Sequence, residues 1–225
     1  NREGLKLDKD YDIHRRYFKR NYLKYLPKDT SVKILDAGCG LGHFLYALTK
    51  EGYQHVNGVD ISEELINFCK KKGFKAINSP LADYLKNNVN MFDVIIFNDV
   101  IEHMNRKEIF EVIQLMYNSL KKDGIILIKT PNMANPITAS GGRYIDFTHE
   151  IGFTEVSMRE LLFACDFNDI KVVGTDIYIF YLNPLNYIAK FSAFIISGLL
   201  YILSHLYGRK TLKIFDKDIL AIAKK

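Results

Sequence analysis

Short apolar runs alternate with longer, helically periodic segments along most of the chain. The runs are rich in Val, Ile and Phe, which is typical of strands buried on both faces. Such alternation predicts an α/β fold in which helices cover both sides of a doubly wound, mostly parallel sheet. We expect strands at 32–37, 55–60, 74–78, 92–98 and 124–130, and helices at 42–51, 62–72, 81–87, 106–121 and 157–165.

The pattern changes after residue 166. The segment "NDIKVVGTDIYIF" predicts a further strand, and "DILAIAKK" predicts a final, antiparallel strand over Asp218 to Ala223 that completes a seven-stranded sheet. Between them lies an apolar helical insertion over 183–211. An amphipathic helix is expected over 10–26. The length of the chain suits one domain, so we interpret 1–225 as a single domain.

Composition and charge narrow the class of protein. The chain has 225 residues, 48% of them hydrophobic, and a net charge of +5 that is spread along the sequence. The longest run of like charge, Lys70 to Lys72, is too short to indicate a nucleic-acid site. The cysteines form no CxxC pair, and the first residues have no apolar signal core. We therefore expect reduced thiols and a cytoplasmic location.

The turn "ILDAGCGLGHFL", residues 34–45, indicates which ligand the fold holds. Its glycines follow a G-x-G-x-G spacing, unlike the G-x-G-x-x-G of dinucleotide sites. Asp36 would repel a phosphate but attract an ammonium group, and Asp60, at the end of the second strand, can accept the hydroxyls of a ribose. S-adenosylmethionine meets these requirements. A tight turn without a ligand, with Asp60 capping a helix, is the alternative, although Ser62 in "SEEL" already fills the capping role.

Four segments in order, "ILDAGCGLGHFL", "VNGVDIS", "FDVIIFNDVIEHM" and "LKKDGIILIKTPN", resemble the class I S-adenosylmethionine-dependent methyltransferases. The resemblance covers about residues 11–180 and the final strand. It implies that the glycine turn lines the methionine end of the cofactor, that Asp60 holds the ribose, and that the turn at Ser79 to Leu81 borders the adenine. The cofactor-binding residues implied in this way are Asp36, Ala37, Gly38, Cys39, Gly40, Gly42, Asp60, Ile61, Ser79, Pro80, Leu81 and Asn98.

Two segments on the ligand side of the predicted sheet carry candidates for the chemistry. "NDVIEHM" follows the fourth strand, and in a helical conformation it would place Asp99 on the same side as Glu102 and His103. "RYIDFTHEIGFT" places His149 in a loop before a helix. Methyl transfer to an alcohol requires loss of the hydroxyl proton, either to a general base or through metal coordination.

This arrangement is similar to that of terminal-ribose methyltransferases acting on small RNAs and of ubiquinone-pathway O-methyltransferases. The similarity implies a divalent ion, magnesium or manganese, held by Asp99, Glu102, His103 and His149. Those relatives often carry Glu where this chain has Asp99. We favour a histidine base without metal over the metal site, with His149 favoured as the base and His103 orienting the cofactor. A third interpretation is that these side chains form a cluster with a purely structural role. The catalytic candidates are His149, His103 and Glu102.

The segment "D-x-T-H-E", followed by "F-T" and "ACDF", resembles methyltransferases of bacterial surface-glycan biosynthesis. This resemblance implies a hydroxyl acceptor on a sugar, a nucleotide-linked sugar or a glycan precursor for polysaccharide biosynthesis. A quinone precursor or another small molecule, a terminal ribose, and a non-catalytic cofactor-binding protein remain as alternatives. A strip of aromatic and basic residues is not evident, so we do not expect a nucleic-acid partner.

The apolar stretch Leu185 to Tyr207 is about long enough to cross a bilayer. A single crossing would leave the final strand on the wrong side of the membrane. We therefore expect helices that either pack on the domain or lie on the membrane surface; the second arrangement would place the protein at the inner face of the membrane. Lys190, Arg209 and Lys210 flank the stretch and favour anionic lipid. A homodimer contact and a lid near the acceptor side are also left open.

Overall fold

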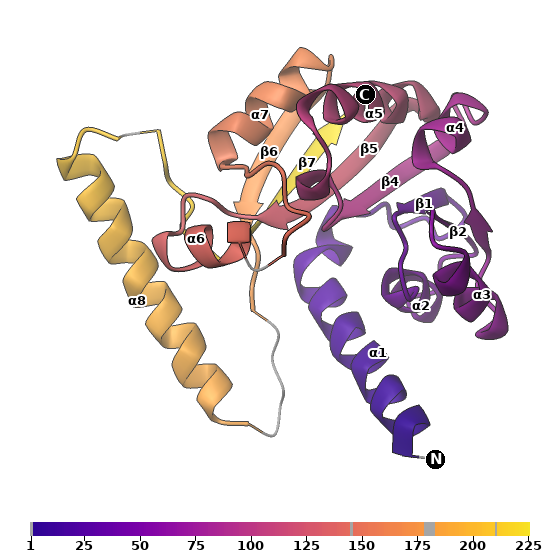
Figure 1. The fold of residues 1–225 in the computed structure, drawn as a ribbon, viewed down its shortest axis with the longest axis horizontal. Helices are drawn as coiled ribbons and strands as arrows, with labels where there is room; N and C mark the ends of the chain where they lie inside the picture. Colours follow the sequence, from indigo (N-terminus) through magenta and orange to yellow (C-terminus); the bar gives the residue numbers. More distant parts are fainter. Residues whose placement is uncertain (1, 145, 178–182, 210) are drawn as a thin grey trace.

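A seven-stranded sheet forms the centre of the computed structural model, which describes residues 2–144, 146–177, 183–209 and 211–225 (Figure 1). The strands follow the order β3-β2-β1-β4-β5-β7-β6. The first five run parallel, and β7 is antiparallel to both of its neighbours. Their bounds are β1 (Lys33–Ala37), β2 (His55–Asp60), β3 (Ala76–Asn78), β4 (Phe92–Asn98), β5 (Leu120–Pro131), β6 (Asn168–Gly174) and β7 (Asp218–Lys224).

Helices cover both faces of the sheet and enclose two apolar cores. One core contains Leu85, Ile113 and Leu162 from three different helices, and the other contains Phe18, Leu48 and Ile66. The helices are α1 (Arg2–Asn21), α2 (His43–Lys50), α3 (Glu63–Lys71), α4 (Leu81–Lys86), α5 (Arg106–Ser119), α6 (Pro136–Tyr144), α7 (Glu155–Ala164) and α8 (Leu185–Leu206), with single 3₁₀ turns η1 (Leu23–Tyr25) and η2 (Ile101–His103). Burial on both sides explains the apolar runs 94–97 of β4 and 125–128 of β5, the central strands of the sheet.

The predicted α/β fold with an antiparallel last strand is confirmed, with shifts at the ends of elements. β5 begins four residues before the expected start at 124, and α1 extends to Arg2 instead of beginning at residue 10. Helix α6 was not expected, because its "SGG" segment has low helix propensity.

The final strand β7 lies between β5 and β6 and is almost entirely buried. It pairs Ile219 with Thr130 on one side and with Gly174 on the other. The insertion that contains α8 therefore leaves and re-enters the sheet at two neighbouring strand ends. Lys210 of the expected 183–211 insertion lies outside the described residues.

A capping box at the start of α5 offers a test of this architecture. The Asn105 side chain accepts hydrogen bonds from the backbone N–H groups of Lys107 and Glu108, and the Glu108 carboxylate accepts from the Asn105 N–H. We expect Asn105→Ala to lower the free energy of unfolding by about 1 kcal/mol, measured by urea denaturation. Asn67→Ala, on the exposed side of α3, is the control and should not destabilise the fold. Equal effects of the two substitutions would contradict the capping role.

Candidate active site

The glycine turn follows β1 at the edge where the parallel strands end. Gly38, Gly40 and Gly42 have φ angles of 76°, 50° and 78°, in the left-handed region that favours glycine. The N–H groups of Gly38 and Cys39 donate to the Val59 carbonyl of β2, at 2.8 and 3.0 Å. These bonds hold the turn against the second strand.

The three glycines serve different purposes. A Cβ on Gly38 would lie 2.5 Å from Val100 Cγ2, and one on Gly42 would lie 2.9 Å from the Phe74 ring, so both are required by packing as well as by φ. A Cβ on Gly40 would meet nothing within 4 Å. The backbone at Gly40 therefore faces open space, where a ligand can approach it.

Asp60, the last residue of β2, holds the turn in place. Its Oδ2 accepts from the Gly40 N–H at 2.9 Å, and its Oδ1 accepts from the Ser62 N–H at 2.9 Å. A carboxylate has about four lone-pair sites, so both oxygens can still accept hydrogen bonds from ligand hydroxyls. Ser62 caps α3 by accepting from the Leu65 N–H, as predicted.

Asp36 is a buried carboxylate beside this turn. Burial raises its pKa to about 7, with a further contribution from the charge of Asp60. Among the described residues, no group donates a hydrogen bond to it. An ammonium group beside Asp36 would compensate both the burial and the repulsion. The site therefore fits the amino-acid end of S-adenosylmethionine.

Asn98, at the end of β4, has an unsatisfied donor. The Tyr22 hydroxyl donates to Asn98 Oδ1 at 2.8 Å, while the buried Asn98 Nδ2 has no hydrogen-bond partner in the part of the chain that the structure describes. Buried polar atoms are normally satisfied. This donor suits the carboxylate of the same methionine group, which the sequence leads us to expect beside Asn98.

The residues expected around the adenine lie at the ends of β2 and β3. The Ser79 N–H donates to the Asp60 carbonyl, and Asn78 Nδ2 donates to the carbonyls of Asp60 and Ile61. Ile61 is 75% exposed, and Pro80 precedes Leu81 at the start of α4. Ala37 and Cys39 are buried under the turn, where a hydrogen bond donated to Cys69 and burial raise the pKa of the Cys39 thiol.

Helix α1 contributes contacts that the sequence interpretation missed. The Tyr11 hydroxyl donates to the Leu41 carbonyl of the glycine turn at 2.6 Å. Asp10 Oδ2 lies 2.8 Å from His43 Nε2, and the His14 ring stacks on His43 at 3.9 Å. The spacing of Asp10 and His14, one turn apart on the helix, was the available signal. These contacts fasten α1 to the start of α2.

Glu102 lies on the acceptor side of the sheet, in η2. It is buried, and burial followed by the charge of Asp99 raises its pKa to about 7. The Thr130 hydroxyl donates to Glu102 Oε2 at 3.1 Å. The Glu102 carbonyl accepts from the N–H groups of Glu150 and Ile151, so η2 is joined to the loop that carries His149.

A hydrogen-bond chain fixes the proton on His103. The Thr148 hydroxyl donates its single hydrogen to Asp146 Oδ1 at 2.7 Å, and His103 Nδ1 lies 2.7 Å from the same hydroxyl oxygen. The Thr148 oxygen must therefore accept from His103 Nδ1–H, which leaves Nε2 unprotonated in the neutral ring. Burial, followed by the nearby His149, lowers the pKa of His103.

Glu102, His103 and His149 converge. Each offers a ligand atom, and these atoms all lie within 4.8 Å of one another. The rings of His103 and His149 are 4.6 Å apart in an edge-on arrangement. One carboxylate and two imidazoles form a donor set that suits manganese, iron or zinc better than magnesium.

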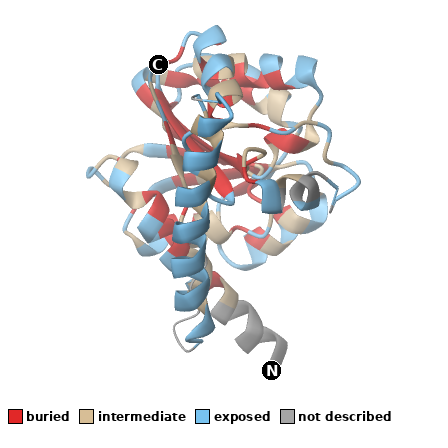
Figure 2. Ribbon diagram, turned by 90° about the vertical axis from the view of Figure 1, so that its left-hand side faces the viewer, coloured by how far each residue is buried: buried red, intermediate tan, exposed pale blue. Residues whose placement is uncertain are grey.

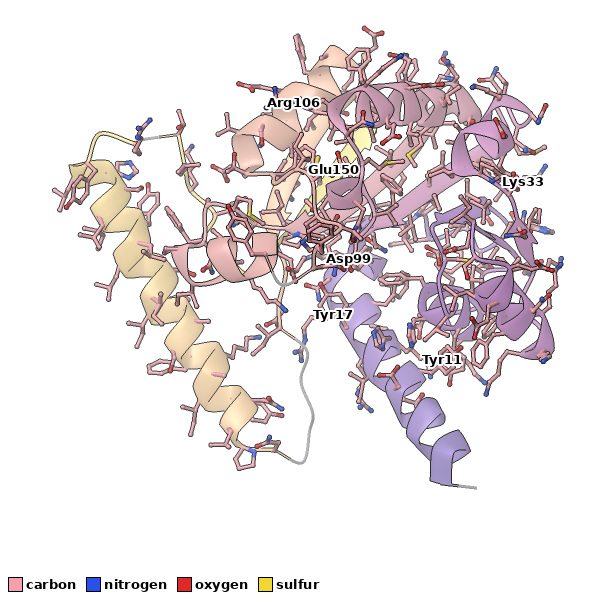
Figure 3. The ribbon with its side chains drawn as sticks, viewed as in Figure 1. Tyr11, Tyr17, Lys33, Asp99, Arg106 and Glu150 are labelled. Carbon is pink, nitrogen blue, oxygen red and sulfur yellow. The ribbon has the colours of Figure 1, made fainter. Side chains whose placement is uncertain are left out.

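Asp99 does not join this cluster, which corrects the helical arrangement considered for "NDVIEHM". Its backbone is left-handed, with a φ of 52°, and η2 begins only at Ile101, so helical spacing does not apply. Its Oδ2 lies 2.6 Å from Nζ of the buried Lys129. Three of the four predicted metal ligands therefore converge. Figure 3 shows Asp99 between Tyr17 of α1 and Glu150 of the loop before α7.

Comparisons with known proteins agree with this geometry. The model of the methyltransferase domain family matches residues 28–159, more than half of the chain. A solved S-adenosylmethionine-dependent methyltransferase from Archaeoglobus fulgidus is similar, with a TM-score of 0.72 and 25% identity over 96% of this chain and 94% of that one.

Curated relatives include ubiquinone biosynthesis O-methyltransferases. The one from Actinobacillus pleuropneumoniae is 28% identical over 68% of this chain and 70% of its own length. The mitochondrial one from Rattus norvegicus is 33% identical over 46% of this chain and 32% of its own length. The chain spans less than half of the length of several curated relatives that it matches.

The geometry at Asp60 predicts a loss of cofactor affinity on substitution. Asp60→Ala removes the acceptor of the Gly40 N–H together with the predicted ribose contact, leaving donors unpaired. We expect affinity for S-adenosylhomocysteine to fall about tenfold or more, as measured by calorimetry. Glu160→Ala, an exposed change on α7, should leave the affinity intact. Equal affinity of Asp60→Ala and the wild type would reject this role.

The buried Asp36 predicts a pH dependence of stability. Its folded pKa of about 7 lies above the ordinary 3.8, so the folded protein holds a proton that the unfolded chain has released. This contribution to stability is complete below the unfolded pKa and is lost as the pH rises through about 7. Without cofactor, the wild type should lose more stability from about pH 5 to pH 8 than Asp36→Asn, measured by urea denaturation. If the stability of the two proteins changed with pH in the same way, this role of Asp36 would be contradicted.

Proposed function

The chain belongs to the class I S-adenosylmethionine-dependent methyltransferases, and we propose that it transfers the cofactor's methyl group to a hydroxyl oxygen. In this reaction the sulfur–methyl bond breaks and an oxygen–methyl bond forms. The hydroxyl proton passes to a base, and S-adenosylhomocysteine is the second product. The observation that carries the proposal is the convergence of Glu102, His103 and His149 at the strand edge that also carries the glycine turn.

The residues of the turn divide the binding of the cofactor among them. Asp36 attracts the ammonium group, Asn98 Nδ2 donates to the carboxylate, and Asp60 accepts the ribose hydroxyls. The open backbone at Gly40 admits the cofactor without a steric clash. When bound, the cofactor supplies an electrophilic methyl group.

The base in this proposal is a histidine of the cluster. The sequence interpretation favoured His149, with His103 orienting the cofactor. The hydrogen bonds that join Asp146, Thr148 and His103 support His103 as the base instead. They leave His103 Nε2 unprotonated and hold the ring in one orientation. The lowered pKa of His103 keeps this nitrogen available at neutral pH. Glu102 then stabilises the imidazolium that forms.

A divalent ion at Glu102, His103 and His149 is the second candidate for activating the hydroxyl. The two imidazoles and one carboxylate leave positions open for an acceptor oxygen, whose pKa the ion would lower. The ion pair of Asp99 with Lys129 argues against a fourth protein ligand. Of the metals considered, manganese fits this donor set better than magnesium.

We propose a sugar hydroxyl on a nucleotide-linked sugar or glycan precursor as the acceptor. The resemblance of "D-x-T-H-E" and "ACDF" to surface-glycan methyltransferases supports this class. A quinone-precursor phenol is the second candidate, and its support is the similarity to ubiquinone biosynthesis O-methyltransferases.

A panel of acceptors tests the proposed activity. Formation of S-adenosylhomocysteine would be measured with nucleotide sugars, extracted lipid-linked glycans, phenolic quinone precursors and short RNAs. We expect turnover with the sugar acceptors. Turnover with phenols alone would contradict the sugar acceptor and identify a phenol as the acceptor, because the site would then be selecting an aromatic hydroxyl. Cofactor binding without turnover of any acceptor would favour the non-catalytic alternative.

Substitutions in the cluster separate the base from the metal. If His103 is the base, His103→Ala should lower kcat by about 10²–10⁴. Activity of the wild type should rise with pH through the lowered pKa of His103 and then level off. Thr148→Val should reduce the rate less, because it removes only the partner that fixes the ring. Chelators should have no effect.

The other outcomes point to different groups. Loss of activity on chelation, restored by manganese and abolished in Glu102→Ala and His149→Ala, would establish the metal. Full activity of folded His103→Ala with an inactive His149→Ala would return the role of base to His149. Lower melting temperatures with unchanged turnover would leave the cluster a structural role.

A further inference from the structure

Helix α8 presents its apolar side chains to solvent. The helix has 22 residues and a mean hydropathy of 1.6, and none of its apolar window is buried. Figure 2 shows it exposed along its whole length, and Figure 1 shows it standing apart from the sheet on the side of α6 and β6. Soluble proteins rarely expose apolar surface of this extent without a partner.

The two sides of α8 differ in a consistent way. Asn186, Lys190, Ser197 and Ser204 are separated by four, seven and seven residues and therefore share one side, the polar strip. Three of these four residues are only partly exposed, so the strip faces the domain. Lys190 Nζ contacts Asp176 Oδ2 at 2.5 Å.

The opposite side, the outward face, is apolar except for Ser192. Its side chains are between 45% and 78% exposed; they are Phe191, Phe194, Ile195, Leu199, Ile202 and Leu206. In a water-soluble helix the apolar stripe faces the core and the polar residues face water. Helix α8 has the reverse orientation, which requires an apolar environment outside the protein.

The connections of α8 prevent it from crossing a bilayer. Beyond the helix, the chain is bound to the domain from Lys213 onward: the Lys213 N–H donates to Glu155, Asn132 donates to the carbonyls of Ile214 and Asp216, and Asn135 donates to that of Phe215. The seven steps from Leu206 to Lys213 reach roughly 25 Å when fully extended. That is shorter than the hydrocarbon core of about 30 Å.

The start of α8 is also held at the domain. The Asp176 N–H donates to Asn21 of α1, and the Asp176 carboxylate contacts both Arg20 and Lys190. The first turns of α8 therefore lie on the domain side of any membrane. If the helix crossed the bilayer, the short return connection would have to span hydrocarbon with unpaired backbone groups.

We propose that α8 docks the protein on the surface of an anionic lipid bilayer, lying in the plane of the interface with its outward face in the acyl region. Two features favour lipid over a second copy of the chain. The apolar arc also includes the exposed Ile188 and Leu203, which makes it wider than the stripe that one partner helix covers. The segment 207–213, "YGRKTLK", carries three basic residues and no acid, which complements anionic headgroups. This inference does not depend on the methyl acceptor.

Tryptophan fluorescence tests the proposal, because the chain contains no Trp. Phe191→Trp, Leu199→Trp and Leu206→Trp each introduce a single reporter on the outward face. With vesicles containing phosphatidylglycerol, each should shift to the blue, and lipids brominated at different depths should place all three at one shallow depth. Phe163→Trp, an exposed site on α7, should not shift. A deep Leu199→Trp between two shallow ends would overturn the interfacial placement in favour of a crossing.

A matched pair of double substitutions tests which surface binds. Phe191→Ser with Phe194→Ser should lower vesicle co-sedimentation by about tenfold or more, because two large apolar side chains leave the acyl region. Phe110→Ser with Phe163→Ser, two exposed phenylalanines on α5 and α7, should have no effect. Unchanged affinity for S-adenosylhomocysteine in both variants would show intact folds.

Three results would overturn the proposal. The first is an absence of vesicle binding by wild-type protein that binds S-adenosylhomocysteine. The second is equal vesicle binding by the two double variants. The third is a lipid-free dimer, seen by analytical ultracentrifugation, that dissociates in the Phe191→Ser, Phe194→Ser variant, since the outward face would then be an interface between copies.

Discussion

Parallel pairing of β1 with β2 and β4 is the constraint on which the candidate site depends. It brings Ala37, Val59 and Phe97 into one register, so Asp36, Asp60 and Asn98 meet at the same edge. The glycine turn must then reverse the chain in a small space. Left-handed backbone and hydrogen bonds to Val59 and Asp60 meet that requirement.

The same edge concentrates polar groups whose burial is not compensated within the described residues. Asp36 is buried without a hydrogen-bond donor, and Asn98 Nδ2 is buried without an acceptor. Both conditions reduce the stability of the folded chain, because buried polar groups lose their hydration. The charged ends of S-adenosylmethionine are complementary to both, so binding recovers stability that the fold alone gives up. Glu102, on the acceptor side, is also buried, but it accepts a hydrogen bond from the Thr130 hydroxyl.

The antiparallel strand β7 has a different consequence. Because β7 lies between β5 and β6, the α8 insertion begins and ends at adjacent strand ends. Asn132 and Asn135 donate to carbonyls of residues 214–216, and Glu155 accepts from the Lys213 N–H; these bonds shorten the second connection further. A helix with the length and composition of a membrane span is thereby restricted to one side of a bilayer. The topology of the sheet decides how an apolar helix can meet lipid.

The sequence by itself determined the elements whose signals are local. Apolar runs located the strands, the glycine spacing with Asp36 and Asp60 indicated the cofactor, and "DILAIAKK" predicted the last strand, because each pattern reflects burial or backbone conformation within a few residues.

Only the tertiary structure decided what depends on long-range contacts. Asp99 turns to Lys129, which follows it by thirty positions in the sequence and lies on the neighbouring strand. Thr148 fixes the proton on His103, and α1 brings Asp10 to His43. The orientation of α8 also depended on the tertiary structure, because helical spacing shows that a polar strip exists but only packing shows that it faces the domain.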